Sequence, residues 1–159
     1  MTLLQKLDDD KTQQIVAVGV LRDAQAEAVA AHLLKYPTNL RVYIYGEKMS
    51  QTARFLGLLK KRIDPELIRL KHQTGLVFTN NNDAQISIRA RSRNVVSCRG
   101  DVPDFTIIVG NPTRQQWYQF MFPLLLITHK WIYFVPRYPS EHMRAMAKTT
   151  SNIITIHKE

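Results

Sequence analysis

Arginine recurs at every second position from Arg89 to Arg93, near the middle of the chain. Apolar residues alternate with it, which is the period of two typical of a β-strand with one buried face. The arginines then project from the other face, where they repel one another unless solvent or phosphates shield them. Because guanidinium groups bind phosphate oxygens in a bidentate manner, the pattern predicts a phosphate-binding surface. Ile86, Ile88 and Ala90 share the apolar face, and Ser87, Arg89, Arg91 and Arg93 share the other.

Positive charge is concentrated in the same part of the chain. The 159 residues carry a formal net charge of +9, and residues 54–99 hold ten Lys and Arg residues against three acids. A localised positive field attracts polyanions and weakens with salt, so we expect nucleic acid as the partner. The alternative is a solvated basic surface without a partner. The predicted nucleic-acid-binding residues are Arg89, Arg91, Arg93 and Arg99, with Lys60, Lys61 and Arg62 in support.

The segment from Gly19 to Ala26 has the placement of a phosphate-binding P-loop, between a predicted strand and a predicted helix. A working loop reads G-x-x-x-x-G-K-[ST], in which the lysine neutralises phosphate charge and the hydroxyl holds Mg²⁺. Here the positions of the second glycine, the lysine and the hydroxyl residue are occupied by other residue types. We therefore predict a degenerate nucleotide loop, in which Arg22 or Lys48 could supply the missing charge. The residues of this loop are Gly19, Arg22, Ala24, Gln25 and Ala26.

No other part of the sequence supplies clear catalytic chemistry. The strand Phe105–Val109 lies where a Walker B strand would end in paired acids, but the chain continues Val109-Gly110-Asn111-Pro112. The five histidines are scattered without a metal-ligand spacing, and Cys98 is the single cysteine. We predict no catalytic residue, no metal site and no cofactor.

The order of predicted elements is β-α-β-α, a hairpin, and then β-α-β-α-β. This order favours an α/β fold with a mostly parallel sheet and helices on both faces, whose ligands bind beyond the carboxyl ends of the strands. The predicted strands are Gln14–Val20, Leu40–Tyr45, Gly75–Thr79, Ala84–Ala90, Phe105–Val109, Trp131–Val135 and Asn152–Ile156. The predicted helices are Asp23–Tyr36, Ser50–Ile63, 111–126 and Ser140–Lys148.

Length and composition suit one domain over residues 1–159, with residues 1–12 as a candidate flexible N-terminal segment. The longest apolar run, Phe120–Thr128, is interrupted by Pro123 and is shorter than the ~20 residues that span a bilayer. The first residues carry acids where a secretory signal would carry bases. We expect an intracellular protein with no membrane partner.

At the level of motifs, the chain resembles the ATPase domain of the large subunit of viral DNA-packaging terminases, especially the herpesvirus-like branch. Residues 42–62 resemble the family's second strand, polar loop and following helix. Ser97-Cys98-Arg99-Gly100, followed by Asp104–Val109, resembles the element that leads into the Walker B strand. Trp131–Pro136 takes the place of the family's sensor strand. The resemblance extends over residues 13–140 in the order of the elements.

The resemblance implies a P-loop-NTPase-like fold, a viral source and a component of a DNA-packaging or helicase-type motor. Combined with the degenerate motifs, it predicts a non-catalytic, ATPase-like module that binds nucleic acid, in particular DNA, and could partner an active motor subunit. In a virus, the location would be the host cytoplasm or nucleus. Two alternatives stay open: a weak or unorthodox ATPase, and a scaffold that binds only protein.

Overall fold

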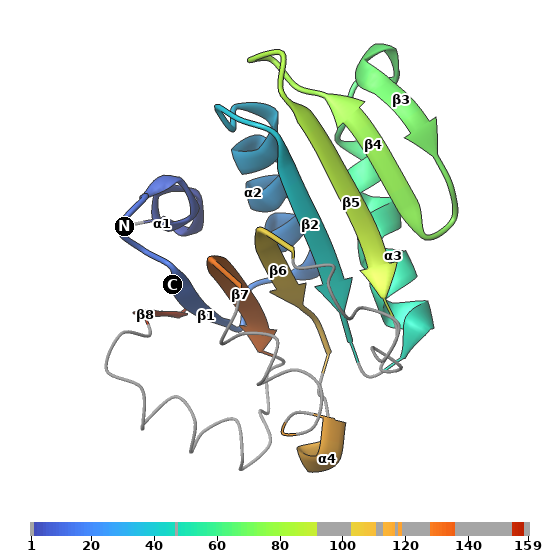
Figure 1. Cartoon of the computed structure of the whole chain (residues 1–159). Helices are drawn as coiled ribbons and strands as arrows, with labels where there is room; N and C mark the ends of the chain where they lie inside the picture. Colours follow the sequence, from blue (N-terminus) through green and yellow to red (C-terminus); the bar gives the residue numbers. More distant parts are fainter. Residues whose placement is uncertain are drawn as a thin grey trace.

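A single sheet of eight strands runs through the molecule (Figure 1). The computed structural model describes residues 2–46, 48–91, 103–110, 113–116, 118 and 128–135, together with the backbone of 154–157. The strands are β1 (Gln14–Val18), β2 (Leu40–Tyr45), β3 (Ile68–Lys71), β4 (Gly75–Thr79), β5 (Gln85–Arg91), β6 (Phe105–Ile108), β7 (Lys130–Val135) and β8 (Ile154–His157).

The strand order is β3-β4-β5-β2-β6-β7-β1-β8. All neighbours from β5 to β8 pair in parallel, whereas β3, β4 and β5 pair antiparallel at one edge. The predicted mostly parallel α/β architecture is therefore confirmed. The carboxyl ends of β1, β7, β6 and β2 lie together at one edge of the sheet, where the fold class places ligands.

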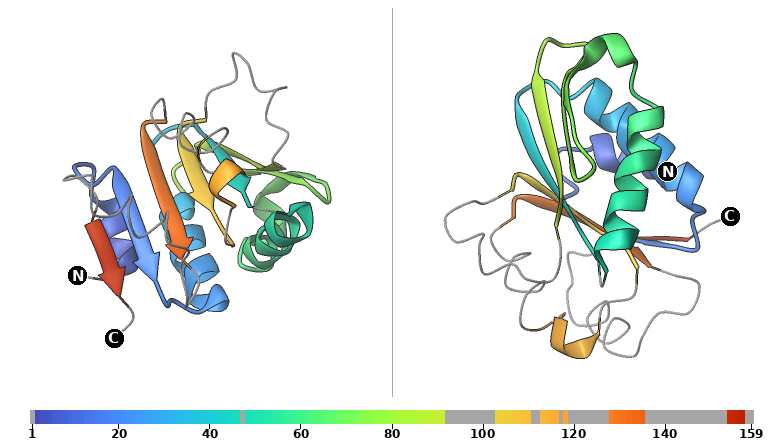
Figure 2. Two further views of the ribbon diagram at one scale, coloured as in Figure 1. Left: turned by 90° about the horizontal axis from the view of Figure 1, so that it is seen from below. Right: turned by 90° about the vertical axis from the view of Figure 1, so that its right-hand side faces the viewer.

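Two long helices cover one face of the sheet (Figure 2, right). They pack there because their buried side chains, such as Val29 and Phe55, meet strand residues such as Ile15, Ile88 and Phe134 in one continuous apolar core. Burying each large apolar side chain stabilises the fold by roughly 1.5–3 kcal/mol. The helices are α1 (Leu3–Asp8), α2 (Arg22–Leu34), α3 (Met49–Lys61), the 3₁₀ turn η1 (Pro65–Leu67) and α4 (Arg114–Gln116).

The opposite face of the sheet has an apolar cluster of its own. Val16, Tyr45, Ile108, Trp131 and Tyr133 are buried members of this cluster, and all of them come from strands. The two helices predicted over 111–126 and 140–148 lie outside the described residues, except for α4 and its immediate neighbours. In the part of the chain that the structure describes, no helix is both long and apolar enough to cross a membrane.

The predicted hairpin is confirmed, with β4 and β5 in antiparallel register from Gly75↔Arg89 to Thr79↔Gln85. Its turn places Asp83 in the left-handed region at φ 62° and Asn80 in the interior. The Asn80 side-chain oxygen accepts hydrogen bonds from the backbone N–H groups of Asn82 and Ala84 at 3.0 and 2.9 Å. The turn residues therefore set the hairpin register, as their types predict.

Two elements differ from the sequence prediction. The run 68–71 forms β3, which was not predicted because its short pattern alternates too little and contains a bulge. Residues 3–8, predicted within a candidate flexible segment, form helix α1. A capping box between Thr2 and Gln5 starts this helix, and the side chain of Leu7 is fully buried in the main core.

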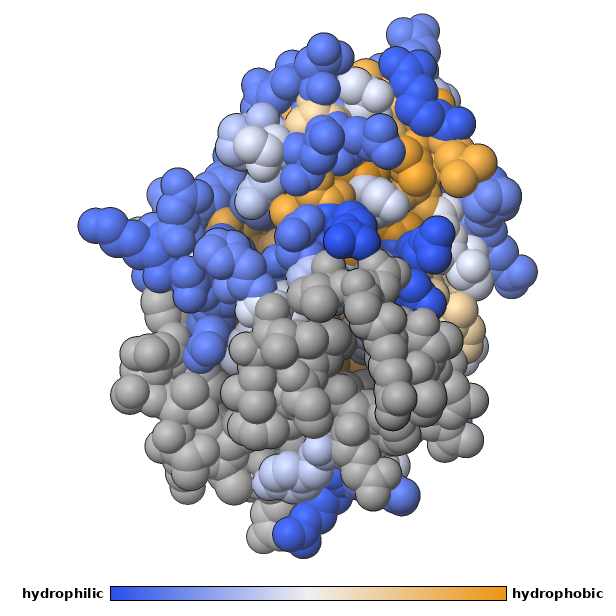
Figure 3. Space-filling model, in the orientation of Figure 1, coloured by the Kyte–Doolittle hydropathy of each residue, from blue (hydrophilic) through white to orange (hydrophobic). Residues whose placement is uncertain are grey.

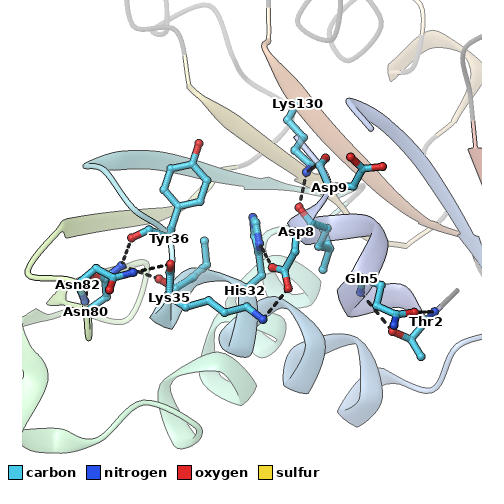
Figure 4. A network of polar contacts seen from close by, with 12 residues as sticks. Thr2, Gln5, Asp8, Asp9, His32, Lys35, Tyr36, Asn80, Asn82 and Lys130 are labelled. Carbon is cyan, nitrogen blue, oxygen red and sulfur yellow. Dashed lines mark hydrogen bonds and ion pairs between the residues drawn. The ribbon is translucent and has the colours of Figure 1, made fainter. Parts of the chain in front are cut away.

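Polar residues fasten α1 to the C-terminal end of α2 (Figure 4). Asp8 contacts His32 Nδ1 at 2.7 Å and Lys35 Nζ at 2.6 Å. Lys130 of β7 is buried and donates to the carbonyl of Leu7 at the end of α1, where the helix dipole favours a cation. On the other side, the Asn80 amide donates to the carbonyls of Leu33 and Tyr36, at 2.9 and 2.8 Å, and so caps α2. We call Asp8, His32, Lys35, Asn80 and Lys130 the α2-end network.

Burial sets the protonation of this network. Desolvation lowers the pKa of His32 below its usual value, and this outweighs the opposing effect of the hydrogen bond to Asp8. The pKa of Lys130 is also lowered, chiefly by burial, although the nearby Asp10, Asp9 and Asp8 act in the other direction. Although burial alone would raise the pKa of Asp8, its hydrogen bonds to Lys35 and His32 bring the net value below normal.

Candidate nucleic-acid interface

The arginines of β5 lie on one face because the strand alternates as its sequence predicts. Ile86, Ile88 and Ala90 are buried against the α3 side of the sheet, whereas Arg89 is exposed on the other side. Parallel pairing with β2 sets Tyr43 opposite Arg89 and Tyr45 opposite Arg91, so the tyrosines share the face of the arginines. The predicted orientation of Arg89 and Arg91 is therefore confirmed.

Arg91 is held in place by the tyrosine beside it. Its guanidinium lies over the Tyr43 ring, 4.7 Å from the ring centroid, and donates to the Tyr43 hydroxyl at 3.3 Å. Tyr43 is itself buried and meets Tyr45 edge-on, with ring centroids 6.2 Å apart. A guanidinium stacked on a fixed ring keeps its charge and loses conformational freedom, so less entropy is lost when it binds an anion.

Two further arginines lie on this face, and neither was predicted from the sequence. Arg41 of β2 lies opposite Ser87 of β5, and its backbone N–H donates to Asp104 Oδ2 at 2.9 Å. Arg69 of β3 reaches over the sheet to donate to the Thr79 hydroxyl at 3.2 Å. We call Arg41, Arg69, Arg89 and Arg91 the arginine face.

A signal for Arg41 was present in the sequence. Alternation in Leu40–Tyr45 places Arg41 on the same side as Tyr43, and parallel neighbours of β5 share its faces. Arg69 had no such signal, because its orientation depends on the bulge between Ile68 and Leu70.

A shallow groove of about 310 Å³ lies on the arginine face, over β3, β4 and β5. Arg89 and Arg91 contribute to its lining, together with Leu70, Val77 and Ser87. Figure 3 shows apolar surface over this part of the molecule, bordered by hydrophilic side chains. Neither Arg89 nor Arg69 forms an ion pair with an acidic side chain among the described residues.

The basic residues of α3 do not belong to this surface. Helix α3 packs on the other side of the sheet, with Phe55, Leu56 and Leu59 in the main core. The Lys60 ammonium donates to the carbonyl of His72, and Arg62 lies 3.8 Å from Glu27 of α2. The predicted support residues Lys60, Lys61 and Arg62 therefore come from the end of a helix on the other side of the sheet, although Lys60 reaches the backbone of His72, which lines the groove. The predicted positions Arg93 and Arg99 lie outside the described residues.

The segment from Gly19 to Ala26 runs directly into its helix. Gly19 has φ 72°, and helix α2 starts at Arg22, so only three residues separate the end of β1 from the helix. The Gln25 N–H donates to the Leu21 carbonyl at 2.9 Å, which is a helical hydrogen bond. The predicted loop residues Ala24, Gln25 and Ala26 therefore lie within the first turns of α2.

The Gln25 side chain folds back onto the segment that connects β1 to α2. Its amide donates to the Val20 carbonyl at 2.8 Å, and its oxygen accepts from Arg22 at 3.0 Å. The Arg22 guanidinium also lies 5.9 Å from the centroid of the Phe55 ring. Desolvation, together with repulsion from Arg54, lowers the pKa of Arg22, which remains charged near neutral pH.

The carboxyl ends of β2 and β6 are closely packed around glycines. Gly110 has φ +83°, and a Cβ built there would lie 2.7 Å from Gln51 Oε1. The Tyr133 hydroxyl donates to the Gly110 carbonyl at 3.0 Å. In the described ranges, no group of three or more His, Cys, Asp or Glu side chains could hold a metal ion.

No family model and no curated protein matches the chain, whereas solved structures do. The large terminase ATPase domain of Thermus phage P74-26 matches with a TM-score of 0.68 and 13% identity, over 99% of this chain and 80% of that domain. The large terminase of a thermophilic bacteriophage, in complex with ADP, matches with a TM-score of 0.66 and 10% identity, over 97% of this chain and 44% of the terminase.

The large terminase of bacteriophage HK97 matches with a TM-score of 0.62 and 12% identity, over 96% of this chain and 37% of that protein. The predicted resemblance to terminase ATPase domains is thereby confirmed at the level of the fold. With its β1 loop, its central β6 and its flanking helices, the chain has the fold of a large terminase ATPase domain.

Proposed function

We propose that this chain is a non-catalytic, ATPase-like module that binds nucleic acid, in particular DNA, through its arginine face. The observation that supports this most strongly is the common orientation of Arg89 and Arg91 over a groove, on the face of β5 that is turned away from the main core. Within a viral DNA-packaging or helicase-type motor, such a module would accompany an active subunit. Its contacts would be mainly to phosphate and would carry little base specificity.

The electrostatics of the arginine face support this proposal. Phosphate contacts dominate protein–nucleic acid affinity because they release condensed counterions. Arginines that already have acidic partners gain little from a phosphate, whereas Arg89 and Arg69 have no such partner in the described part of the chain. The stacking of Arg91 on Tyr43 fixes one guanidinium beside them.

The geometry of the β1–α2 connection supports the non-catalytic part of the proposal. A phosphate cradle needs a loop whose backbone N–H groups converge on the ligand, followed by a lysine. In this chain the corresponding N–H groups belong to helix α2, and the Gln25 side chain satisfies the Val20 carbonyl from the inside. Gly110, at the position expected for Walker B acids, packs against Gln51 instead.

DNA affinity measured over a salt series tests the proposal. Arg89→Ala should weaken binding about tenfold at low salt and lower the slope of log K against log salt by about one unit, because one phosphate contact is lost. Arg114→Ala is the matched control, since it removes an exposed arginine of α4 that does not line the groove. Absence of DNA binding at low salt, or equal effects of the two substitutions, would refute the proposal.

One observation favours the alternative of nucleotide binding without a P-loop lysine. Arg22 and Arg54 are close enough to repel each other, and neither forms an ion pair with an acid in the described part of the chain. An anion between them would relieve this repulsion. An ATP-dependent rise in melting temperature that is lost in Arg22→Ala would support this alternative, and phosphate release would make the chain an enzyme.

A further inference from the structure

The arginine face contains an apolar centre that a phosphate surface does not need. Leu70 is 48% exposed on β3. The sheet register places it opposite Val77, which in turn lies opposite Ser87 of β5. Gly75, opposite Arg89, leaves the floor beside that arginine without a side chain. The cations thus border a hollow in which the apolar side chains of Leu70 and Val77 lie among polar groups.

The dimensions of this hollow limit what can enter it. Its volume of about 310 Å³ lies at the lower end of the ~300–1,000 Å³ of pockets that hold small organic molecules. A DNA duplex is too wide to enter the hollow, because its major groove alone is about 12 Å wide. Against a flat surface, a duplex presents mainly its sugars and phosphates. A single strand can turn a base or sugar into the hollow while its phosphates remain at the rim.

We propose that the arginine face binds single-stranded nucleic acid in preference to duplex, with an unpaired nucleoside seated over Leu70 and Val77 and the flanking phosphates on Arg89 and Arg69. This inference rests on the proposed nucleic-acid-binding function. Arg69 and Arg89 lie two strands apart, which separates them by about 10 Å across the sheet. Arg69 bonds to Thr79, at the other end of β4 from Gly75, so the two arginines also differ in position along the strands. Arg89 therefore lines the hollow at the Gly75 end, and Arg69 lies beyond its other end, next to Thr79.

The contact of an unpaired base with Leu70 accounts for the preference for a single strand over a duplex. Unpaired bases bury their faces on protein side chains, whereas bases in a duplex are already stacked on one another. Covering Leu70 therefore stabilises only the complex with a single strand. Charge alone does not discriminate in this direction, because a duplex carries the higher density of phosphates.

The test compares an oligothymidylate with a hairpin duplex of equal phosphate number, both by fluorescence anisotropy at one salt concentration. We expect tighter binding of the single strand. Leu70→Ser should weaken single-strand binding about fivefold and leave duplex binding unchanged, because the area lost is that of one half-exposed leucine. Leu21→Ser is the matched control, since Leu21 is 65% exposed but lies before α2.

The outcomes separate the two proposals. Duplex binding that equals or exceeds single-strand binding, or a Leu70→Ser effect that is the same on both probes, would overturn the single-strand preference and leave the basic nucleic-acid surface in place. Failure of both probes to bind at low salt would overturn the proposed function itself. Melting temperature provides the folding check, and Leu70→Thr, which keeps β-propensity, replaces the serine variant if that variant melts early.

Discussion

The α2-end network and the arginine face both gather charged side chains, but they treat the charges in opposite ways. In the network, Asp8 contacts both His32 and Lys35, and the buried Lys130 ends on backbone carbonyls. On the arginine face, Arg89 is exposed and has no acidic partner in the described part of the chain. Charges satisfied within the protein fix its structure, whereas unsatisfied surface charges are available to an external anion.

The two regions also occupy different parts of the same sheet. The network lies at the edge where β5, β6 and β7 begin, whereas the groove lies on the open face of the antiparallel extension formed by β3, β4 and β5. Substitutions in the network should therefore change stability and leave nucleic-acid binding intact. Substitutions in the arginine face should do the reverse. Four predictions test this separation, in order of decreasing effect.

The largest expected effect comes from Asn80. Its buried side chain makes four hydrogen bonds, two to carbonyls at the end of α2 and two to N–H groups of its own turn. Asn80→Ala leaves these groups unsatisfied and should lower the free energy of unfolding by about 3 kcal/mol, measured by urea denaturation. Asn81→Ala is the control, because Asn81 is exposed and bonds through its backbone N–H. Equal destabilisation by both variants would contradict the role of the Asn80 side chain.

Much of this fold could be predicted from the sequence because its signals are local. The hydrophobic run of β2 and the asparagine-rich turn before β5 each specify their element without reference to the rest of the chain. Helix α1 could not be predicted in this way. It is only six residues long, and its stability depends on tertiary contacts of Leu7 and Asp8 with elements far along the sequence.

The second prediction concerns His32 and acid. Because burial lowers its pKa in the folded state, the unfolded state binds more protons as the pH falls below about 6.5. Stability should therefore decrease with falling pH in this range, by at most about 1.4 kcal/mol per pH unit from this residue. The lowered pKa of Asp8 adds acid sensitivity at a lower pH, in the same direction.

His32→Gln should flatten this pH dependence between about pH 7 and 5, measured as the free energy of unfolding. His72→Gln serves as the control, because His72 is exposed at the end of β3. If the His32 variant keeps the slope of the unmodified protein, the acid sensitivity arises elsewhere. DNA binding at neutral pH should be unchanged in the His32 variant, since His32 lies in the α2-end network and does not line the groove.

The third prediction concerns Arg89 of the arginine face, where a substitution should change DNA binding and leave stability nearly unchanged. Arg89→Ala should leave the free energy of unfolding within about 0.5 kcal/mol of the unmodified protein, because an exposed side chain without an ion pair contributes little to the folded state. The same protein samples should show the loss of DNA affinity. A large loss of stability would mean that Arg89 is part of the fold and would weaken its assignment to the interface.

The interface was less predictable than the fold, for a physical reason. Period-two alternation assigns a face to each residue of a strand, so Arg89 and Arg91 could be placed. Whether the lysines of α3 join that face depends on which side of the sheet the helix packs, and local sequence does not contain this information. The sequence prediction therefore included Lys60 of α3, which donates to the carbonyl of His72, and did not include Arg69 of β3.

The smallest expected effect isolates the stacking of Arg91 on Tyr43. Arg91→Lys keeps the positive charge but loses the planar contact with the ring, 4.7 Å from guanidinium to centroid, and the hydrogen bond to the hydroxyl. Affinity for DNA should fall about twofold, since the loss of a half-buried cation–π contact that orients the charge costs roughly 0.5 kcal/mol. Arg91→Ala should cost clearly more, because it removes the charge as well, and the salt slope should change only in the alanine variant. Equal losses in both variants would show that the geometry of the guanidinium, and not its charge, determines binding at this position, and the arginine face would then act by shape as much as by electrostatics.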